Sequence, residues 1–172
     1  MTSLLKINAL LGVFLCLIAL SGCKISLDGA SIPPEMKTIN VTVFENNAPL
    51  VVASLSSQFT EELKTRIRNQ TKLSITPNDA HAVFSGNITG YDITPVAIQD
   101  NKQPTAGANR LTIRVQVKYV NNLNPKQSFD ESFERFKDFK LVGSLQSLEG
   151  PLIKDVTAQL TEDIFNRAFA QW

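Results

Sequence analysis

Apolar and polar residues alternate along three stretches of the chain, 38–44, 81–91 and 111–119. Successive side chains of a β-strand point to opposite faces, so this alternation predicts three strands that are each buried on one face. The third stretch is the clearest, with apolar residues at every second position: Leu111, Ile113, Val115, Val117 and Tyr119. We therefore expect the core to lie on one side of a sheet.

A fourth strand is predicted after the asparagine-rich segment 121–126, whose composition is typical of a hairpin loop. This strand carries Phe129, Phe133 and Phe136. Its pattern is irregular, because Glu131 faces the core if Phe129 and Phe133 do. We therefore expect either a β-bulge or an edge position for this strand.

Two further stretches repeat apolar residues at intervals of three or four, which predicts amphipathic helices. The first helix is expected over 55–69, with Ser54 as its N-cap. The second is expected from about residue 148 to the end of the chain, with Ser147 as its N-cap. Pro151 then falls in the first turn, where its missing N–H removes no bond within the helix. The apolar residues of the two stripes are Leu55, Phe59, Leu63 and Ile67, followed by Leu148, Leu152, Ile153, Val156, Leu160, Ile164, Phe165, Ala168, Phe169 and Trp172.

The order strand, helix, three strands, helix predicts an α+β fold, an α/β sandwich. We expect a four-stranded mixed sheet with both helices on one face, and with the first strand parallel to a neighbour through a right-handed crossover. Between these elements, 45–49 is expected to be a turn. The link 92–109 contains Pro95, Pro104 and Gly107 and is long for a loop, so we expect it to be either functional or disordered.

The first 22 residues follow the pattern of a secretory signal peptide. Lys6 precedes an apolar run over 9–20, which small residues separate from Cys23. The run is shorter than the roughly 20 apolar residues that a membrane-spanning helix needs. The tetrapeptide Leu-Ser-Gly-Cys at 20–23 looks like a bacterial lipobox, in which the cysteine receives a diacylglycerol and becomes the first mature residue. We therefore expect a signal peptide over 1–22.

Lipidation of Cys23 is expected to hold the protein at a membrane, because two or three acyl chains bind far more firmly than one. The alternative is a free or intermolecularly paired thiol, since Cys16 is removed with the signal peptide. Residues 23–37 are then either an extended tether or a short segment that lies on the fold, and the domain covers 38–172. Lys24 stands where an aspartate acts in some bacteria as an inner-membrane retention signal, which favours the outer membrane.

The charge of the expected mature chain is balanced. The full sequence has 17 basic and 16 acidic residues, and removal of 1–22 takes away Lys6 and no acid, which leaves 16 of each. A neutral domain has no long-range field to steer it to nucleic acid, so electrostatic recognition must come from a local patch. The roughly 150 mature residues are enough for one domain with a core that needs no disulfide.

The sequence offers little catalytic chemistry. His81 is the only histidine, and without a second histidine or a mature thiol it cannot complete a usual zinc site or a Cys-His pair. Glu61 and Glu62 fall on a predicted helix surface, where a solvated face is the ordinary interpretation. Gly86 and Gly90 precede no helix, so no phosphate loop is indicated. We expect no enzyme, cofactor or metal, unless a deep pocket surrounds His81.

A row of basic residues is the remaining candidate site. Arg110, Arg114 and Lys118 share the polar face of one predicted strand, at intervals of about 13 Å. Such a row could bind lipid phosphates or an acidic partner. The alternative, which the hairpin geometry favours, is that Asp130 and Glu134 of the next strand pair with these cations across the sheet.

Four short motifs stand in a recognisable order along the mature chain. They are Gly29-Ala30-Ser31-Ile32-Pro33-Pro34, Asn46-Asn47-Ala48-Pro49-Leu50, Arg110-Leu111-Thr112-Ile113, and Asp163-Ile164-Phe165-Asn166 with the terminal Trp172. Their order and spacing after a lipidated cysteine resemble the lipopolysaccharide-assembly lipoprotein family LptE. The resemblance spans nearly the whole mature chain, and its motifs are structural rather than chemical.

The resemblance implies a two-helix, four-stranded α/β sandwich, the same fold that the residue pattern predicts. It also implies an outer-membrane lipoprotein that plugs the lumen of the β-barrel protein LptD, helps that barrel to assemble and assists lipopolysaccharide delivery to the cell surface. Basic residues bind lipopolysaccharide in the family, but the motifs do not align those positions, so Arg110, Arg114 and Lys118 are candidates from the strand pattern alone. The alternative function is a freestanding envelope lipoprotein that binds a small ligand or acts as a scaffold.

Overall fold

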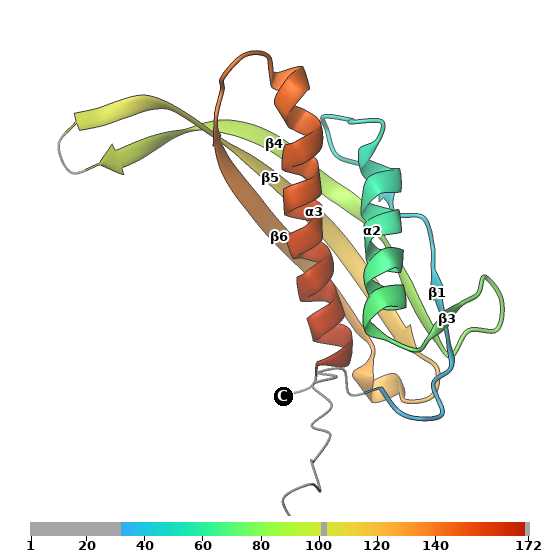
Figure 1. Ribbon diagram of the computed structural model, residues 1–172. Helices are drawn as coiled ribbons and strands as arrows, with labels where there is room; N and C mark the ends of the chain where they lie inside the picture. The colour runs from blue at the N-terminus through green and yellow to red at the C-terminus, as the bar shows by residue number, and fades with distance from the viewer. Residues whose placement is uncertain (1–31, 101–102, 171–172) are drawn as a thin grey trace, which may run out of the picture.

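A mixed β-sheet forms one layer of the protein and two helices form the other (Figure 1). The computed structural model describes residues 32–100 and 103–170, with side chains described over 32–96 and 108–170. The expected signal peptide and Cys23 lie outside the described residues. The elements are β1 Thr38–Val41, β2 Glu45–Asn46, α2 Leu55–Gln70, β3 Ser74–Ile75, β4 Ala82–Asp100, β5 Gln103–Asn121, the short 3-10 helix η1 Pro125–Gln127, β6 Phe129–Lys140 and α3 Leu145–Phe169.

The sheet has the strand order β3-β1-β4-β5-β6, and β2 pairs separately with β4. β1 is parallel to β3 and to β4, whereas β4, β5 and β6 are antiparallel to their neighbours. Both helices lie on one face of this sheet (Figure 1). The α+β class, the mixed sheet and the parallel first strand are therefore confirmed.

The sheet has six strands rather than the expected four. The two additional strands, β2 and β3, contain two residues each, which is too short to produce an alternation in the sequence. β2 lies within 45–49, so the expectation of a simple turn there is wrong. Glu45 and Asn46 pair in parallel with Asn87 and Ile88 of β4.

The helix positions agree with the apolar stripes, but their caps differ from expectation. Ser54 stands at the N-cap of α2 without a side-chain cap bond. The expected cap of the second helix, Ser147, is wrong: α3 begins at Leu145, and Ser144 Oγ accepts from Ser147 N. Pro151 consequently lies inside the helix rather than in its first turn.

The expectation of a loop over 92–109 is wrong, because the described residues of this segment belong to two long strands. β4 continues to Asp100 and β5 begins at Gln103, and their ladder extends as a two-stranded arm beyond the helices (Figure 1). Pro95 falls where β5 is the only strand paired with β4 in the described chain. A proline is tolerated at such an edge because the missing N–H need not break a ladder bond.

β6 is an edge strand, as its irregular pattern suggested. Its register with β5 is continuous from Phe129 to Lys140, so the edge position is confirmed and a bulge in this pair is not present. Glu131 does face the helix side, where Arg167 of α3 pairs with it at 2.6 Å. Charges that point inward from an edge strand also disfavour pairing with another chain.

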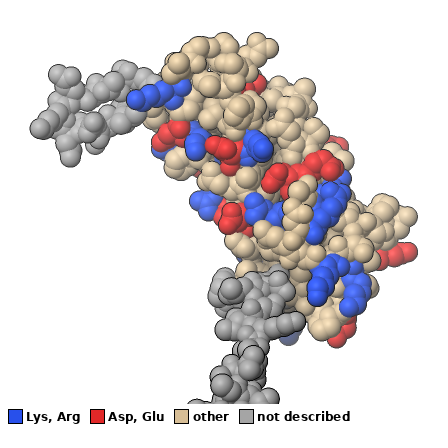
Figure 2. Space-filling model, viewed as in Figure 1, with Lys and Arg blue, Asp and Glu red and all other residues tan. Residues whose placement is uncertain are grey.

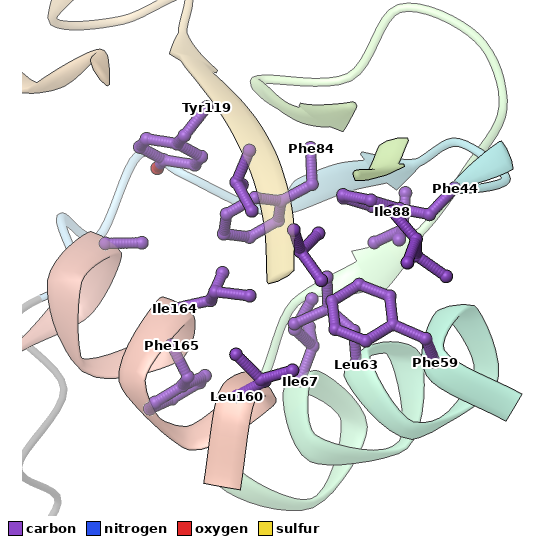
Figure 3. Close-up of a cluster of buried hydrophobic side chains, with 14 of the residues drawn as sticks. Phe44, Phe59, Leu63, Ile67, Phe84, Ile88, Tyr119, Leu160, Ile164 and Phe165 are labelled. Atoms are coloured by element: carbon purple, nitrogen blue, oxygen red, sulfur yellow. The ribbon is translucent and has the colours of Figure 1, made fainter. Parts of the chain in front are cut away.

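The core fills the space between the sheet and the helices (Figure 3). Every apolar residue of the predicted α2 stripe is buried, and so is the alternating set of β5. Phe84 of β4 lies with its ring centroid 4.7 Å from that of Tyr119 and 6.1 Å from that of Phe169. Burial raises the pKa of Tyr119 to about 12, so its hydroxyl stays neutral at physiological pH.

Polar contacts join the two helices to each other and join α3 to the sheet around this core. Arg66 of α2 donates to the carbonyl of Ala158 in α3 at 2.9 Å. Tyr91 of β4 donates to Glu149 at 2.8 Å. Burial is the main cause that raises the pKa of Tyr91, and the hydrogen bond to Glu149 raises it further. Three ion pairs join α3 to the edge strand: Arg135 with Asp163, Lys137 with Asp155, and Arg167 with Glu131.

Candidate functional site

The candidate site is the face of the sheet opposite the helices, which we call the open face. Side chains of β5 and β6 that alternate with the buried ones lie there. The predicted basic row runs along β5, and a row of mainly acidic residues runs beside it on β6. In register from β5 to β6, the pairs are Arg110 with Asp138, Thr112 with Phe136, Arg114 with Glu134, Gln116 with Ser132 and Lys118 with Asp130.

Arg114 lies at the centre of this face and contacts two carboxylates. Its Nη2 donates to Asp92 of β4, and its Nε lies 3.1 Å from Glu134 of β6. Gly90 makes room for it, because a Cβ at that position would lie 3.0 Å from Arg114 Nε. The guanidinium therefore bridges three strands, and its charge is matched within the fold.

Arg110 is matched in a similar way. Its Nε and Nη2 donate to the two oxygens of Asp138 at 2.6 and 2.9 Å, a bidentate arrangement. The hydrogen bond from Arg110 lowers the pKa of the Asp138 carboxyl. The guanidinium carbon also lies 3.7 Å from the centroid of the exposed Phe136 ring.

Lys118 differs from the two arginines. Its register partner Asp130 accepts a hydrogen bond from Gln116 Nε2 at 2.6 Å instead. Lys118 is exposed and forms no ion pair with a carboxylate in the described part of the chain. Within the row, Lys118 is thus the cation that can bind an external anion without breaking an ion pair.

The two arginines of the basic row therefore follow the cross-strand pairing interpretation, whereas Lys118 does not. Cross-strand pairing holds for Arg114 with Glu134, and Arg110 pairs with Asp138, an acid that the sequence argument did not name. The predicted pairing of Asp130 with a cation of the row is wrong, because Gln116 binds Asp130. A signal for Asp138 was present, since Asp130, Glu134 and Asp138 follow one another at every fourth residue of one strand face.

Asp92 was missed for another reason. It falls in the segment that was expected to be a loop, so its place opposite Thr112 in the β4–β5 ladder could not be anticipated. Knowledge of that ladder would have placed it beside Arg114.

His81 joins two segments of the fold through hydrogen bonds. Its Nδ1 accepts from the backbone N–H groups of Lys37 and Thr38 at 3.1 and 3.2 Å, and the backbone N–H of His81 donates to Thr38 Oγ1 at 3.1 Å. Its carbonyl accepts from Asn122 N at 2.9 Å. His81 thus fastens the start of β1 to the β5–β6 loop.

Two grooves are described, and neither is lined by His81. The first, about 480 Å³, lies between residues 32–37 and the end of α2, and the second, about 410 Å³, lies between α2 and α3. Within the described residues no group of three or more metal-ligating side chains occurs. No helix in the same part of the chain is both long and apolar enough to cross a bilayer.

Comparison with known proteins connects this fold to one family. The family model described as LptE, lipopolysaccharide-assembly, matches residues 36–168. A search of curated proteins finds no match.

Two solved structures have a similar fold. A minor lipoprotein from Acinetobacter baumannii is similar with a TM-score of 0.51 and 13% identity, over 77% of this chain and 91% of that one. A hypothetical protein from Chlamydia trachomatis is similar with a TM-score of 0.53 and 11% identity, over 77% of this chain and 98% of that one. At such identities the likeness concerns the fold alone.

Proposed function

The chain belongs to the LptE lipopolysaccharide-assembly family, and we propose that it is anchored in the outer membrane through Cys23, where it fills the lumen of the β-barrel protein LptD. The match over residues 36–168 is the observation that carries this proposal. LptE is a non-enzymatic family of envelope lipoproteins. The protein would accordingly act by binding: it would help the barrel to assemble and assist delivery of lipopolysaccharide to the cell surface.

The self-paired open face suits a protein enclosed in a polar barrel lumen. Arg110 and Arg114 are already bound to acids of neighbouring strands. Enclosure therefore does not leave these charges without partners, which would be costly. The β4–β5 arm adds reach, since it extends beyond the two-layer body (Figure 1).

Lys118 is our candidate for direct contact with lipopolysaccharide. Its ammonium group carries no ion pair in the described chain, and it is exposed on the open face. A phosphate could bind it as a point charge without displacing a carboxylate. For Arg110 and Arg114 we propose a supporting role, because an external phosphate must compete with Asp138, Asp92 or Glu134.

Co-purification from solubilised membranes tests the proposal. A tagged full chain should bring down a large β-barrel protein, and depletion of the chain should lower the amount of that barrel. Cys23→Ala should block lipidation and the cleavage that follows it, keep the protein out of the outer-membrane fraction and reduce barrel recovery. Cys16→Ala is the matched control and should change none of these, because Cys16 lies within the expected signal peptide.

The result that would overturn the proposal is recovery of the chain without a large β-barrel partner, together with barrel levels that do not respond to depletion. Acyl-chain mass on the peptide that begins at Cys23 is the direct test of the anchor. An unmodified thiol there would exclude it.

A further inference from the structure

One end of the sandwich carries basic side chains that the fold does not neutralise. We call it the tether end, because the described chain begins there, beside the last turn of α2 and the loop that contains η1 (Figure 1). Lys37, Arg68, Lys72 and Lys126 lie at this end, and all four are exposed. None lies within 4.0 Å of a carboxylate oxygen of the described residues.

The segments that carry these cations are fastened together. Lys37 and Lys72 both line the groove between residues 32–37 and α2. The backbone of Lys37 is joined through His81 to Asn122, four residues before Lys126. The tether end is therefore a fixed surface rather than a set of independent chain ends.

Basic side chains at this end lie near a few acidic ones. Figure 2 shows basic side chains at the lower end near the last turn of α2, with acidic ones beside them. Glu35 and Asp79 are the exposed acids in the adjoining segments. Lys64 is the ion-pair partner of Glu61, and its hydrogen bond is the main cause that lowers the pKa of the Glu61 carboxyl; Arg68 adds only a smaller charge effect.

We propose that the tether end lies against the anionic phospholipid headgroups of the bilayer in which the acyl chains of Cys23 are inserted. This orientation rests on the anchor proposed above. The ten residues from Cys23 to Ile32 are nine steps of the backbone and span at most roughly 30 Å when fully extended, so this end cannot move far from the membrane surface. Within about 10 Å of that surface, lysine and arginine are attracted by anionic lipid.

The apolar residues of this end also fit an interfacial position. Leu123 is exposed in the loop that carries Lys126, and Ile32 lines the groove that Lys37 and Lys72 share. An apolar side chain next to cationic ones is the combination that peripheral segments present to a headgroup region.

Amine labelling on vesicles tests the orientation. The full lipidated protein is reconstituted into phosphatidylethanolamine vesicles that contain either phosphatidylglycerol or phosphatidylcholine, and flotation is used to verify the anchor. On phosphatidylglycerol, labelling of Lys37, Lys72 and Lys126 should fall several-fold relative to phosphatidylcholine. It should recover in about 0.5 M salt, because salt screens the attraction between the lysines and the anionic lipid. Lys140 and Lys154, distant exposed lysines, should label equally on both.

Matched variants separate charge from folding. The triple variant Lys37→Gln, Arg68→Gln, Lys72→Gln should return Lys126 labelling on phosphatidylglycerol to its phosphatidylcholine level, whereas Lys140→Gln, Lys154→Gln should leave it lowered. Flotation with equal Lys126 labelling on both lipids would overturn the orientation alone. Failure to float with either lipid would overturn the anchor, and the orientation with it.

Discussion

The two faces of the sheet share the same strands but are stabilised by different interactions. On the covered face, apolar residues of β4 and β5 pack against two helices, and the charges of β6 pair with α3. On the open face, charged and polar residues bind one another across the strands. Burial of apolar surface is the main favourable term in folding, whereas exposed ion pairs contribute at most about 1 kcal/mol each. The covered face therefore holds the fold, and the open face can be changed without unfolding it.

The largest expected difference between the faces comes from truncating a phenylalanine. Phe84→Ala should lower the free energy of unfolding by about 3–5 kcal/mol, because its buried ring contacts Tyr119 and Phe169. Phe136→Ala is the matched change on the open face, where the side chain is 46% exposed, and should cost far less. Urea denaturation of both variants measures this difference. Similar losses would mean that the open face is covered in the isolated protein.

A smaller but related difference is expected at two glycines of β4. A Cβ at Gly86 would lie 2.0 Å from the carbonyl oxygen of Gln116, and its φ of +154° disfavours other residues. Gly86→Ala should therefore destabilise the protein by about 1–3 kcal/mol, the usual range for overpacking.

Gly90→Ala is the control for this change. Its nearest obstacle is the guanidinium of Arg114 at 3.0 Å, which can move. Thermal unfolding should show a clear drop in Tm for Gly86→Ala and little change for Gly90→Ala. The reverse order would show that Arg114 holds the strands more firmly than the buried backbone contact does.

The smallest effect concerns a single proton on the open face. Arg110 lowers the pKa of Asp138 in the folded protein. The pair therefore stabilises the fold above the usual carboxyl pKa near 3.8, and this contribution is lost as the pH falls through the lowered value. Arg110→Gln should raise the pKa of Asp138 toward its usual value. NMR titration of the carboxyl carbon measures this, and an unchanged midpoint would mean that the ion pair does not form in solution.

The elements of the fold also differ in how well the sequence predicts them. The buried stripes of α2 and β5 were predictable, because side-chain periodicity depends only on the local conformation. The pairing of 92–109 was not, since Pro95 and Pro104 indicate a loop unless the partner strand is known. β2 and β3 depend on their neighbours for the same reason.

The candidate site was predictable in its rows but not in its partners. Strand parity placed Arg110, Arg114 and Lys118 on one face. Which acid each cation binds depends on register and on competition, as Gln116 shows by binding Asp130 opposite Lys118. The place of Asp92 beside Arg114 depends on the continuation of β4 beyond Tyr91, which the sequence pattern did not predict.

Site-specific photocrosslinking in living cells tests most directly whether the open face serves the proposed function. A photoreactive residue in place of Ser132, which lies on the open face beside the Lys118–Asp130 register pair, is compared with one in place of Lys154 on the exposed side of α3. We predict a lipopolysaccharide adduct from position 132 and a much weaker one from position 154, with a β-barrel adduct from at least one of them. Equal lipopolysaccharide adducts from both positions, or none from 132, would contradict the account.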